Sequence, residues 1–264
     1  MTKSKFNTPT PSATAGLPPS LRLLLALLIP PIGAVLLSGL ATLLRPVDPA
    51  DGRFANVLLL GGIGLVSLFL GTGWYGLRGL GLRGGRPLYA SIGFASMLWV
   101  VFIIVRFAWI LNTSFGVAGG TREFVYLLLF EAFAVQLWTF GLFFRALADW
   151  RGPLTAAIGS GILFGVIGFF FFEESFFNNP INLISLTFFL LWGLFYGIVR
   201  LRTGSVIGAI IIQAMQSFTA WVVLIPANIP PDLTDMQTVY TISAIASLIF
   251  IWRLWPKEVA DYRV

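Results

Sequence analysis

Long apolar runs separated by short polar segments fill this chain from residue 21 almost to its end. Each run is about long enough to cross a hydrocarbon core of roughly 30 Å as a helix. Glycine, proline and asparagine mark the boundaries, as in RGGRP and GVAGGTR. The pattern predicts eight membrane-spanning helices, near 21–43, 55–78, 87–111, 123–147, 153–172, 181–199, 204–226 and 237–255. We therefore expect an all-α polytopic membrane protein, with a polar N-terminal tail over 1–20 and a transmembrane domain over 21–264.

Composition supports this class of protein and narrows the available chemistry. The chain is 57% hydrophobic and only 11% charged, whereas soluble domains carry about 25% charged residues. It has no cysteine and no histidine, which removes thiolate ligands, the commonest metal ligand and the usual general base. We expect no metal and no cofactor, and a bound lipid or pigment would be held without histidine ligation. No basic block alternates with aromatic residues, so nucleic acid is not an expected partner.

The distribution of basic residues predicts the orientation in the membrane. With a cytoplasmic N-terminus, 13 of the 17 basic residues fall on the cytoplasmic side. These are Lys3, Lys5, Arg22, Arg78, Arg83, Arg86, Arg145, Arg151, Arg200, Arg202, Arg253, Lys257 and Arg263. The positive-inside rule then places both termini in the cytoplasm, and we expect a bacterial inner membrane.

Two local patterns have ordinary explanations. The GLGLRG stretch over 79–84 fits the glycine-rich fingerprint of dinucleotide sites, but that fingerprint needs a strand before it. A basic loop at the level of the lipid headgroups is the better interpretation. Glu173 and Glu174 follow the apolar run FGVIGFFFF and are interpreted as a solvated helix end rather than a catalytic pair.

Two charged residues, Arg106 and Glu131, fall inside the third and fourth predicted helices. An ionisable side chain in the hydrocarbon region is costly and usually has a partner. We expect these two to form a structural ion pair, with a functional polar cavity as the alternative.

Three stretches combine into a larger pattern. FGLFFRAL contains Phe140, Gly141 and Arg145, LFGVIGF contains Phe164 and Gly168, and TGSVIGAIIIQAMQS contains Gln213 and Ser217. In order and context they resemble the motifs of the CAAX-protease and bacteriocin-processing family of intramembrane glutamate proteases, also called the Abi family. Those motifs are Glu-Glu-x-x-x-Arg, Phe-x-x-x-His and His-x-x-x-Asn or Asp, carried on an eight-helix bundle.

The resemblance implies a degenerate member of that family. Arg145 and Phe164 are kept, while Phe140 and Gly141 stand for the two glutamates and Gly168 and Gln213 for the histidines. Ser217 stands for the final Asn or Asp. Activation of water needs a carboxylate or imidazole of suitable pKa, or a metal. Arg145 would then be a scaffold residue whose donors go to backbone carbonyls, Asp149 or lipid phosphate.

The expected function is that of a pseudoprotease, acting as a structural or accessory subunit of a membrane complex. A photosynthetic or energy-transducing assembly is one such complex, and the expected partners are other membrane subunits and lipid. Two alternatives stay open: an active peptidase that uses a relocated carboxylate, and a small transporter. The Gly-x-x-x-Gly of Gly193 and Gly197 favours close helix approach, either to a partner or within the chain.

Overall fold

The computed structural model describes residues 16–44, 52–109, 120–172, 183–219 and 233–263, and within these ranges the regular elements are all helices. The predicted all-α class is confirmed. Most of the polar tail, together with Glu173 and Glu174, lies outside the described residues.

The helices follow the predicted apolar runs closely. They are α1 Pro19–Leu44, α2 Gly52–Gly79, α3 Arg86–Trp109, α4 Gly120–Tyr126, α5 Phe133–Gln136, α6 Phe144–Arg151, α7 Pro153–Phe172, α8 Leu183–Thr203, α9 Ile207–Phe218 and α10 Leu233–Leu254. Two π-helical segments, η1 Leu127–Ala132 and η2 Leu137–Phe143, join α4, α5 and α6 into one continuous span, and a 3-10 turn, η5 Val259–Asp261, follows α10.

Seven of the eight predicted spans are long and apolar enough to cross a membrane. The described part of the remaining one, α9, has 12 residues and reaches only about 18 Å at 1.5 Å per residue. Its predicted continuation beyond residue 219 lies outside the described residues.

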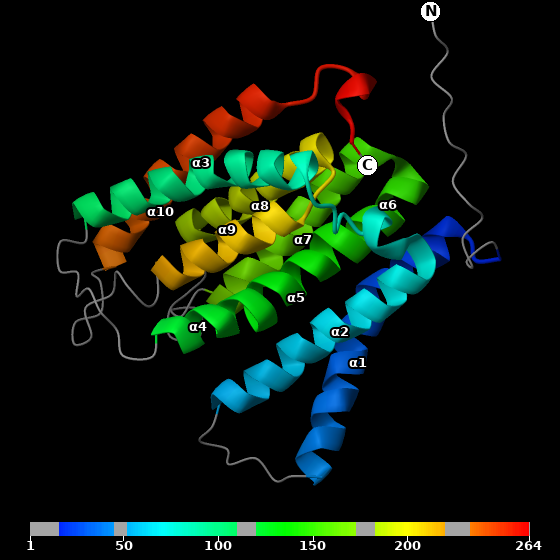
Figure 1. The fold of residues 1–264 in the computed structure, drawn as a ribbon. Coiled ribbons are helices and arrows are strands. Elements are labelled where there is room, and N and C mark those ends of the chain that lie inside the picture. The colour runs from blue at the N-terminus through cyan, green and yellow to red at the C-terminus, as the bar shows by residue number, and fades with distance from the viewer. Residues whose placement is uncertain (1–15, 45–51, 110–119, 173–182, 220–232, 264) are drawn as a thin grey trace, which may run out of the picture.

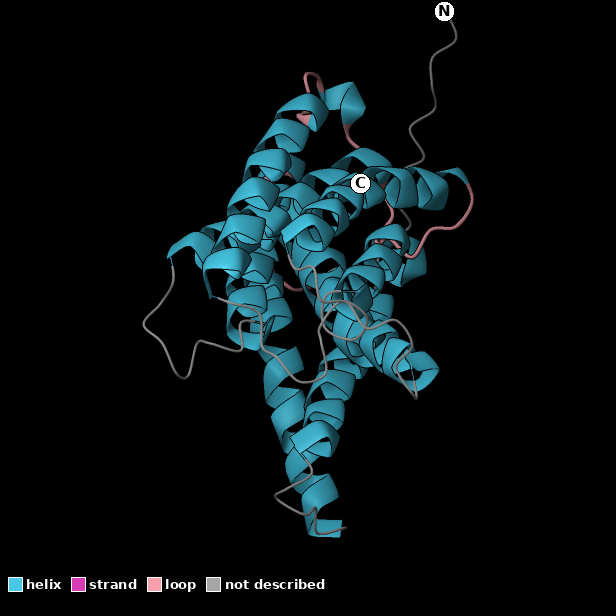
Figure 2. Cartoon of the chain, turned by 90° about the vertical axis from the view of Figure 1, so that its left-hand side faces the viewer, coloured by secondary structure: helices cyan, strands magenta, loops and turns pink. Residues whose placement is uncertain are grey.

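The helices form a bundle with a two-helix extension. α1 packs mainly against α2, and Figures 1 and 2 show this pair extending beyond the rest of the molecule. In the main bundle, α8 packs against α7 and α10, and α9 lies against α3 and η1. The span from α4 to α6 therefore contacts both the α1–α2 pair and the main bundle.

Small residues hold α7 and α8 together. A Cβ at Gly193 would meet the carbonyl oxygen of Gly161, and a Cβ at Gly197 would meet that of Ala157. The Gly-x-x-x-Gly motif is therefore packed against this chain's own α7, which is the second of the two alternatives that the sequence left open. The physical reason is that α7 carries small residues at matching positions, so both backbones approach closely.

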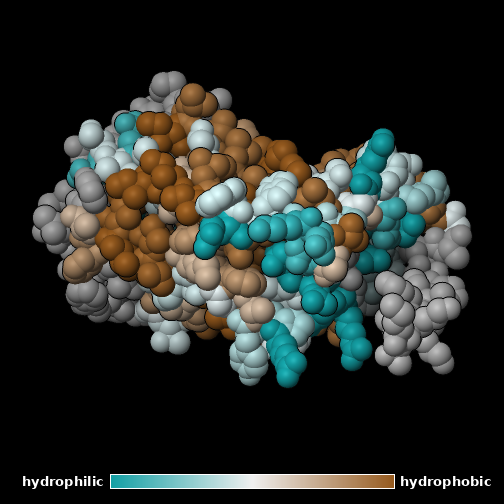
Figure 3. Space-filling view, turned by 90° about the horizontal axis from the view of Figure 1, so that it is seen from above, coloured by the Kyte–Doolittle hydropathy of each residue, from teal (hydrophilic) through white to brown (hydrophobic). Residues whose placement is uncertain are grey.

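The aromatic residues of α8 also face inward. Phe188, Phe189, Trp192, Phe195 and Tyr196 are all nearly inaccessible and belong to the main core cluster. Exposed large apolar side chains lie instead mainly on α1, α2, α3, α7 and α10. In Figure 3 hydrophilic side chains gather over one part of the surface and hydrophobic ones over another.

Basic residues from distant parts of the sequence meet at one end of the bundle. Arg22 and Arg145 both bind Asp149, and the backbone N–H of Val206 donates to the carbonyl of Gly81. Nearby, the N–H of Arg263 donates to Leu201. We call this region the arginine end, defined by Arg22, Arg78, Arg83, Arg145, Arg200 and Arg202. It joins segments that the charge pattern predicts to be cytoplasmic; which side of a membrane it faces stays a prediction.

Candidate functional site

A row of buried polar side chains links the span between α4 and α6 to α9. Gln136 Nε2 donates to Gln213 Oε1 at 2.7 Å, and Ser217 Oγ donates to Glu131 Oε1, also at 2.7 Å. Gln136 and Gln213 are fully buried. We call Glu131, Gln136, Gln213 and Ser217 the polar ladder, because the two helices run in opposite directions with one hydrogen bond at each step.

The local helix geometry explains how the polar ladder forms. Residues five apart lie about 140° from each other around an ideal α-helix, so Glu131 and Gln136 would face different directions. The π-helical segments beside them have wider turns with i→i+5 hydrogen bonds. Both side chains consequently reach α9, where Gln213 and Ser217 occupy one face at the ordinary four-residue spacing.

The polar ladder retains hydrogen-bonding capacity that no described residue satisfies. Gln136 Oε1 and Gln213 Nε2 have no hydrogen-bond partner, and neither has Oε1 of the neighbouring Gln216. A glutamine amide has both a donor nitrogen and an acceptor oxygen. In Gln136 and Gln213 only one of these two atoms is hydrogen-bonded. The ladder therefore combines two incompletely satisfied amides with one partly buried carboxyl group, that of Glu131.

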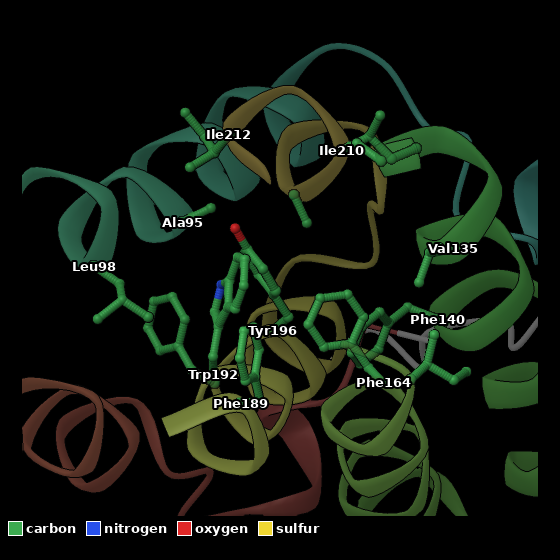
Figure 4. Close-up of a cluster of buried hydrophobic side chains, with 14 of the residues drawn as sticks. Ala95, Leu98, Val135, Phe140, Phe164, Phe189, Trp192, Tyr196, Ile210 and Ile212 are labelled. Atoms are coloured by element: carbon green, nitrogen blue, oxygen red, sulfur yellow. The ribbon is translucent and has the colours of Figure 1, made fainter. Parts of the chain in front are cut away.

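Aromatic rings fill the position beside the polar ladder. The rings of Phe140 and Phe164 lie 5.4 Å apart, and Tyr196 lies 6.4 Å from Phe140 and 5.8 Å from Phe164. Figure 4 shows Phe140 and Phe164 next to each other with Tyr196 alongside. Phe140 and Phe164 are fully buried, so the first and second sequence motifs meet through an apolar contact.

The other motif positions are distributed around this contact. Gly141 packs against the loop after α2, where a Cβ would lie 3.3 Å from the carbonyl oxygen of Leu80. Gly168 is buried one turn after Phe164. Gln213 and Ser217 meet Gln136 and Glu131, which precede Phe140 in the sequence by four and nine residues. The three motifs thus lie on neighbouring helices, while Gly141 faces another direction.

The predicted pair of Arg106 and Glu131 is corrected by the structure. Glu131 accepts a hydrogen bond from Ser217, while Arg106 Nη1 donates to Met236 Sδ at 3.4 Å and lies over the Phe102 ring. Helix α9 separates the two, since it contacts both α3 and η1. The prediction assumed that consecutive helices pack side by side, but the tertiary fold inserts a later helix between them.

Arg145 has one of the expected partners, since its Nη2 lies 3.2 Å from Asp149 Oδ1 on the next turn. Its guanidinium also lies over the ring of Tyr75, 5.9 Å from the centroid. A more deeply buried arginine, Arg200, was missed as a site residue.

Arg200 is 1% exposed and fixes two separate backbone segments. Its Nε donates to the carbonyl of Phe140 at 3.1 Å and its Nη2 to that of Gly79 at 3.3 Å. Gly81, at φ +83°, leaves room for this guanidinium, because a Cβ there would lie 2.7 Å from its central carbon. Sequence alone does not distinguish Arg200 from Arg202, since both end the same apolar helix.

Comparison with known proteins identifies one family. Residues 118–219 match the family model described as Rce1-like, type II CAAX prenyl endopeptidase Rce1-like. No curated protein and no solved structure matches the chain. The matched stretch contains the span from α4 to α6, the aromatic contact and the whole polar ladder. The resemblance that the three motifs predicted is therefore confirmed over residues 118–219, the part of this membrane protein that matches the Rce1-like family model.

Proposed function

We propose that this protein lacks the hydrolytic activity of its family and acts through contacts, as a structural or accessory subunit in the membrane. The observation that carries the proposal is the packing of Phe140. Its ring is fully buried against Phe164 and Tyr196, and the motif resemblance assigns this position to the family's first glutamate. A phenyl ring there excludes water and supplies no base.

The side chains at the other motif positions do not replace the missing chemistry. General base catalysis needs a group that can accept a proton near neutral pH. Gln213 stands for a histidine, and its amide is neutral and already bonded to Gln136. Ser217 donates its hydroxyl hydrogen to Glu131, and no imidazole exists in the chain to activate it.

The residues at the motif positions also do not fit a metal. Phenylalanine and glycine have no side-chain ligand, and glutamine amides are poor ligands for zinc. Among the described residues, no group of three or more acidic, histidine or cysteine side chains could hold a metal ion. We derive no step through a metal for this site.

The accessory role is supported by the shape of the molecule. The α1–α2 pair extends from the bundle (Figure 2), and α1 exposes leucine, isoleucine and valine along its length. Such a helix can contact either lipid or a neighbouring membrane subunit. Crosslinking from single cysteines on α1 is clean in this chain because it has no native cysteine.

The test is cleavage of a prenylated CAAX peptide by the purified protein in mild detergent. We expect no cleavage above a no-protein blank, with zinc or with a chelator. Cleavage that depends on this protein would contradict the proposal. The Glu131→Gln variant is assayed beside it, because that change removes the only carboxylate of the polar ladder while keeping its shape.

A second candidate is a peptidase with a relocated carboxylate, and one observation favours it. Glu131 lies at 2.7 Å from Ser217, which is a position of the third family motif. In this case the wild-type protein would cleave the peptide and Glu131→Gln would abolish cleavage. The two candidates therefore give opposite results in the same assay.

A further inference from the structure

A pocket of about 740 Å³ opens at the arginine end, in the loop that connects α2 to α3. It is lined by Arg78, Leu82, Arg83, Gly84 and Pro87. Arg78 and Gly84 are exposed, and Arg83 is partly buried. The pocket thus has two guanidinium groups and no acidic side chain in its lining.

The arginine end carries more positive charge than its carboxylates balance. At the arginine end, the ion pairs among the described residues join Arg22 and Arg145 to Asp149 and Arg202 to Asp261. None of them includes Arg78, Arg83 or Arg200.

Arg200 lies directly under the pocket loop, against Gly81, and its Nη1 has no hydrogen-bond partner. Burial, followed by the positive charges of Arg145 and Arg78, lowers the pKa of Arg83 from its ordinary value. The guanidinium groups of Arg78, Arg83, Arg145 and Arg200 thus gather positive charge around the pocket loop.

The loop is held in place by contacts to distant segments. Arg83 Nε donates to the carbonyl of Arg78 at 2.9 Å, and Ser205 Oγ donates to the carbonyl of Arg83 at 2.9 Å. Arg83 Nη1 also donates to the carbonyl of Arg263 at 3.3 Å. A site fixed in this way loses little conformational entropy when it binds a ligand.

We propose that this pocket binds a phosphate group, held by Arg78 and Arg83. Guanidinium groups match phosphate oxygens in charge and geometry, and basic pockets between membrane helices bind phosphorylated lipid headgroups. The phosphate belongs either to an anionic lipid or to a soluble phosphate, and the two share the same contacts. The site is separate from the polar ladder and does not depend on whether the protein hydrolyses peptides.

The test uses the full-length protein in a neutral detergent and a phosphate-free buffer. Binding of phosphatidylglycerol, phosphatidylcholine and inorganic phosphate is measured by titration calorimetry. We expect saturable binding of phosphatidylglycerol or inorganic phosphate and weaker binding of phosphatidylcholine. If inorganic phosphate displaces bound phosphatidylglycerol, the site recognises the phosphate group itself and takes a soluble phosphate. If phosphatidylglycerol stays bound in excess inorganic phosphate, the site takes a lipid headgroup.

Two matched variants decide whether the pocket is responsible. Arg78→Gln removes an exposed charge from the pocket lining, and Arg86→Gln removes an exposed charge at the first residue of α3, outside the lining. We expect Arg78→Gln to weaken binding about tenfold, as for one lost charge-assisted hydrogen bond, and Arg86→Gln to change it much less. Equal weakening by both variants, or no saturable binding of any phosphate ligand, would overturn the proposal.

Discussion

The polar ladder and the arginine end provide hydrogen-bond partners for buried polar groups in different ways. Both place polar groups in an apolar helical bundle. The ladder pairs side chain with side chain between two helices. At the arginine end, guanidinium groups bond chiefly to backbone carbonyls and to two carboxylates.

The difference follows from what each region offers. In the middle of a helix the carbonyls are already bonded within the helix, so a side chain needs another side chain. At helix ends and in loops, as at Gly79 and Arg263, the carbonyls are available. Arg200 also reaches the carbonyl of Phe140, which lies inside the π-helical segment η2. An arginine with five donors can therefore satisfy several carbonyls at once.

The largest expected effect comes from Arg200→Ala. The change leaves the carbonyls of Phe140 and Gly79 without this donor and opens a cavity between α8 and the α2–α3 loop. We expect the free energy of unfolding to fall by about 3–5 kcal/mol, measured by reversible unfolding in mixed micelles.

Arg202→Ala is the matched control for that change. Arg202 lies two residues further along, is partly exposed and pairs with Asp261. Arg202→Ala should therefore lower the free energy of unfolding by less than about 1 kcal/mol. If the two variants were equally stable, Arg200 would not be joining the two backbone segments.

An intermediate effect is expected in the polar ladder. Gln136→Leu or Gln213→Leu alone leaves a buried amide without its partner. Each change should lower the free energy of unfolding by about 1–3 kcal/mol. The double variant should cost less than the sum, with a coupling of about 0.6 kcal/mol as is usual between membrane helices. A thermal or denaturant unfolding series of the four proteins measures it.

Gln216→Leu serves as the control for that cycle, because Gln216 is buried on the same helix and is not bonded to Gln136. The losses of unfolding free energy caused by Gln216→Leu and by Gln136→Leu should therefore add in the double variant. If the losses of unfolding free energy from Gln136→Leu and Gln213→Leu added strictly, the hydrogen bond between the two amides would contribute nothing to stability.

The smallest effect belongs to the C-terminal turn at the arginine end. The backbone N–H groups of Lys257 and Glu258 and the Arg202 guanidinium hold the pKa of Asp261 below its ordinary value. The contribution of Asp261 to stability is thus present above its ordinary pKa and is lost as pH falls through the lowered folded-state pKa. Since the group is exposed, we expect only local release of residues 257–263.

Amide hydrogen exchange of Arg263, which donates to Leu201, measures this release. Asp261→Asn at neutral pH should raise the exchange rate by less than about fivefold. Asp235→Asn at the other end of α10 should leave it unchanged. An equal response to both variants would exclude a specific role for the Asp261 contacts.

Much of the fold was predictable because membrane insertion depends on simple properties of the sequence. A span needs about 20 apolar residues, and seven of the eight predicted spans meet that requirement. The family was predictable from Arg145, Phe164 and the order of the three motifs, and the match over residues 118–219 confirms it. That Phe140 and Gln213 stand for a catalytic glutamate and histidine stays a prediction from the sequence.

The partners of the buried polar residues were not predictable in the same way. Pairing Arg106 with Glu131 assumed that neighbours in sequence are neighbours in space. For Gly193 and Gly197 the sequence left open whether the close neighbour was another subunit or this chain, and the structure places α7 there. Both questions depend on which helix lies beside which, and apolar periodicity carries little information on that choice.

The sequence by itself determined the membrane class, the helix positions and the absence of imidazole and thiol chemistry. These follow from hydrophobicity and from the residue types present, which are local properties. Only the tertiary structure decided that α9 lies between α3 and the span from α4 to α6, that π-helical turns bring Glu131 and Gln136 to the same partner helix, and that Arg200 rather than Arg202 is buried. Those outcomes depend on close packing between distant segments, where the fit of whole helices outweighs the preference of any one residue.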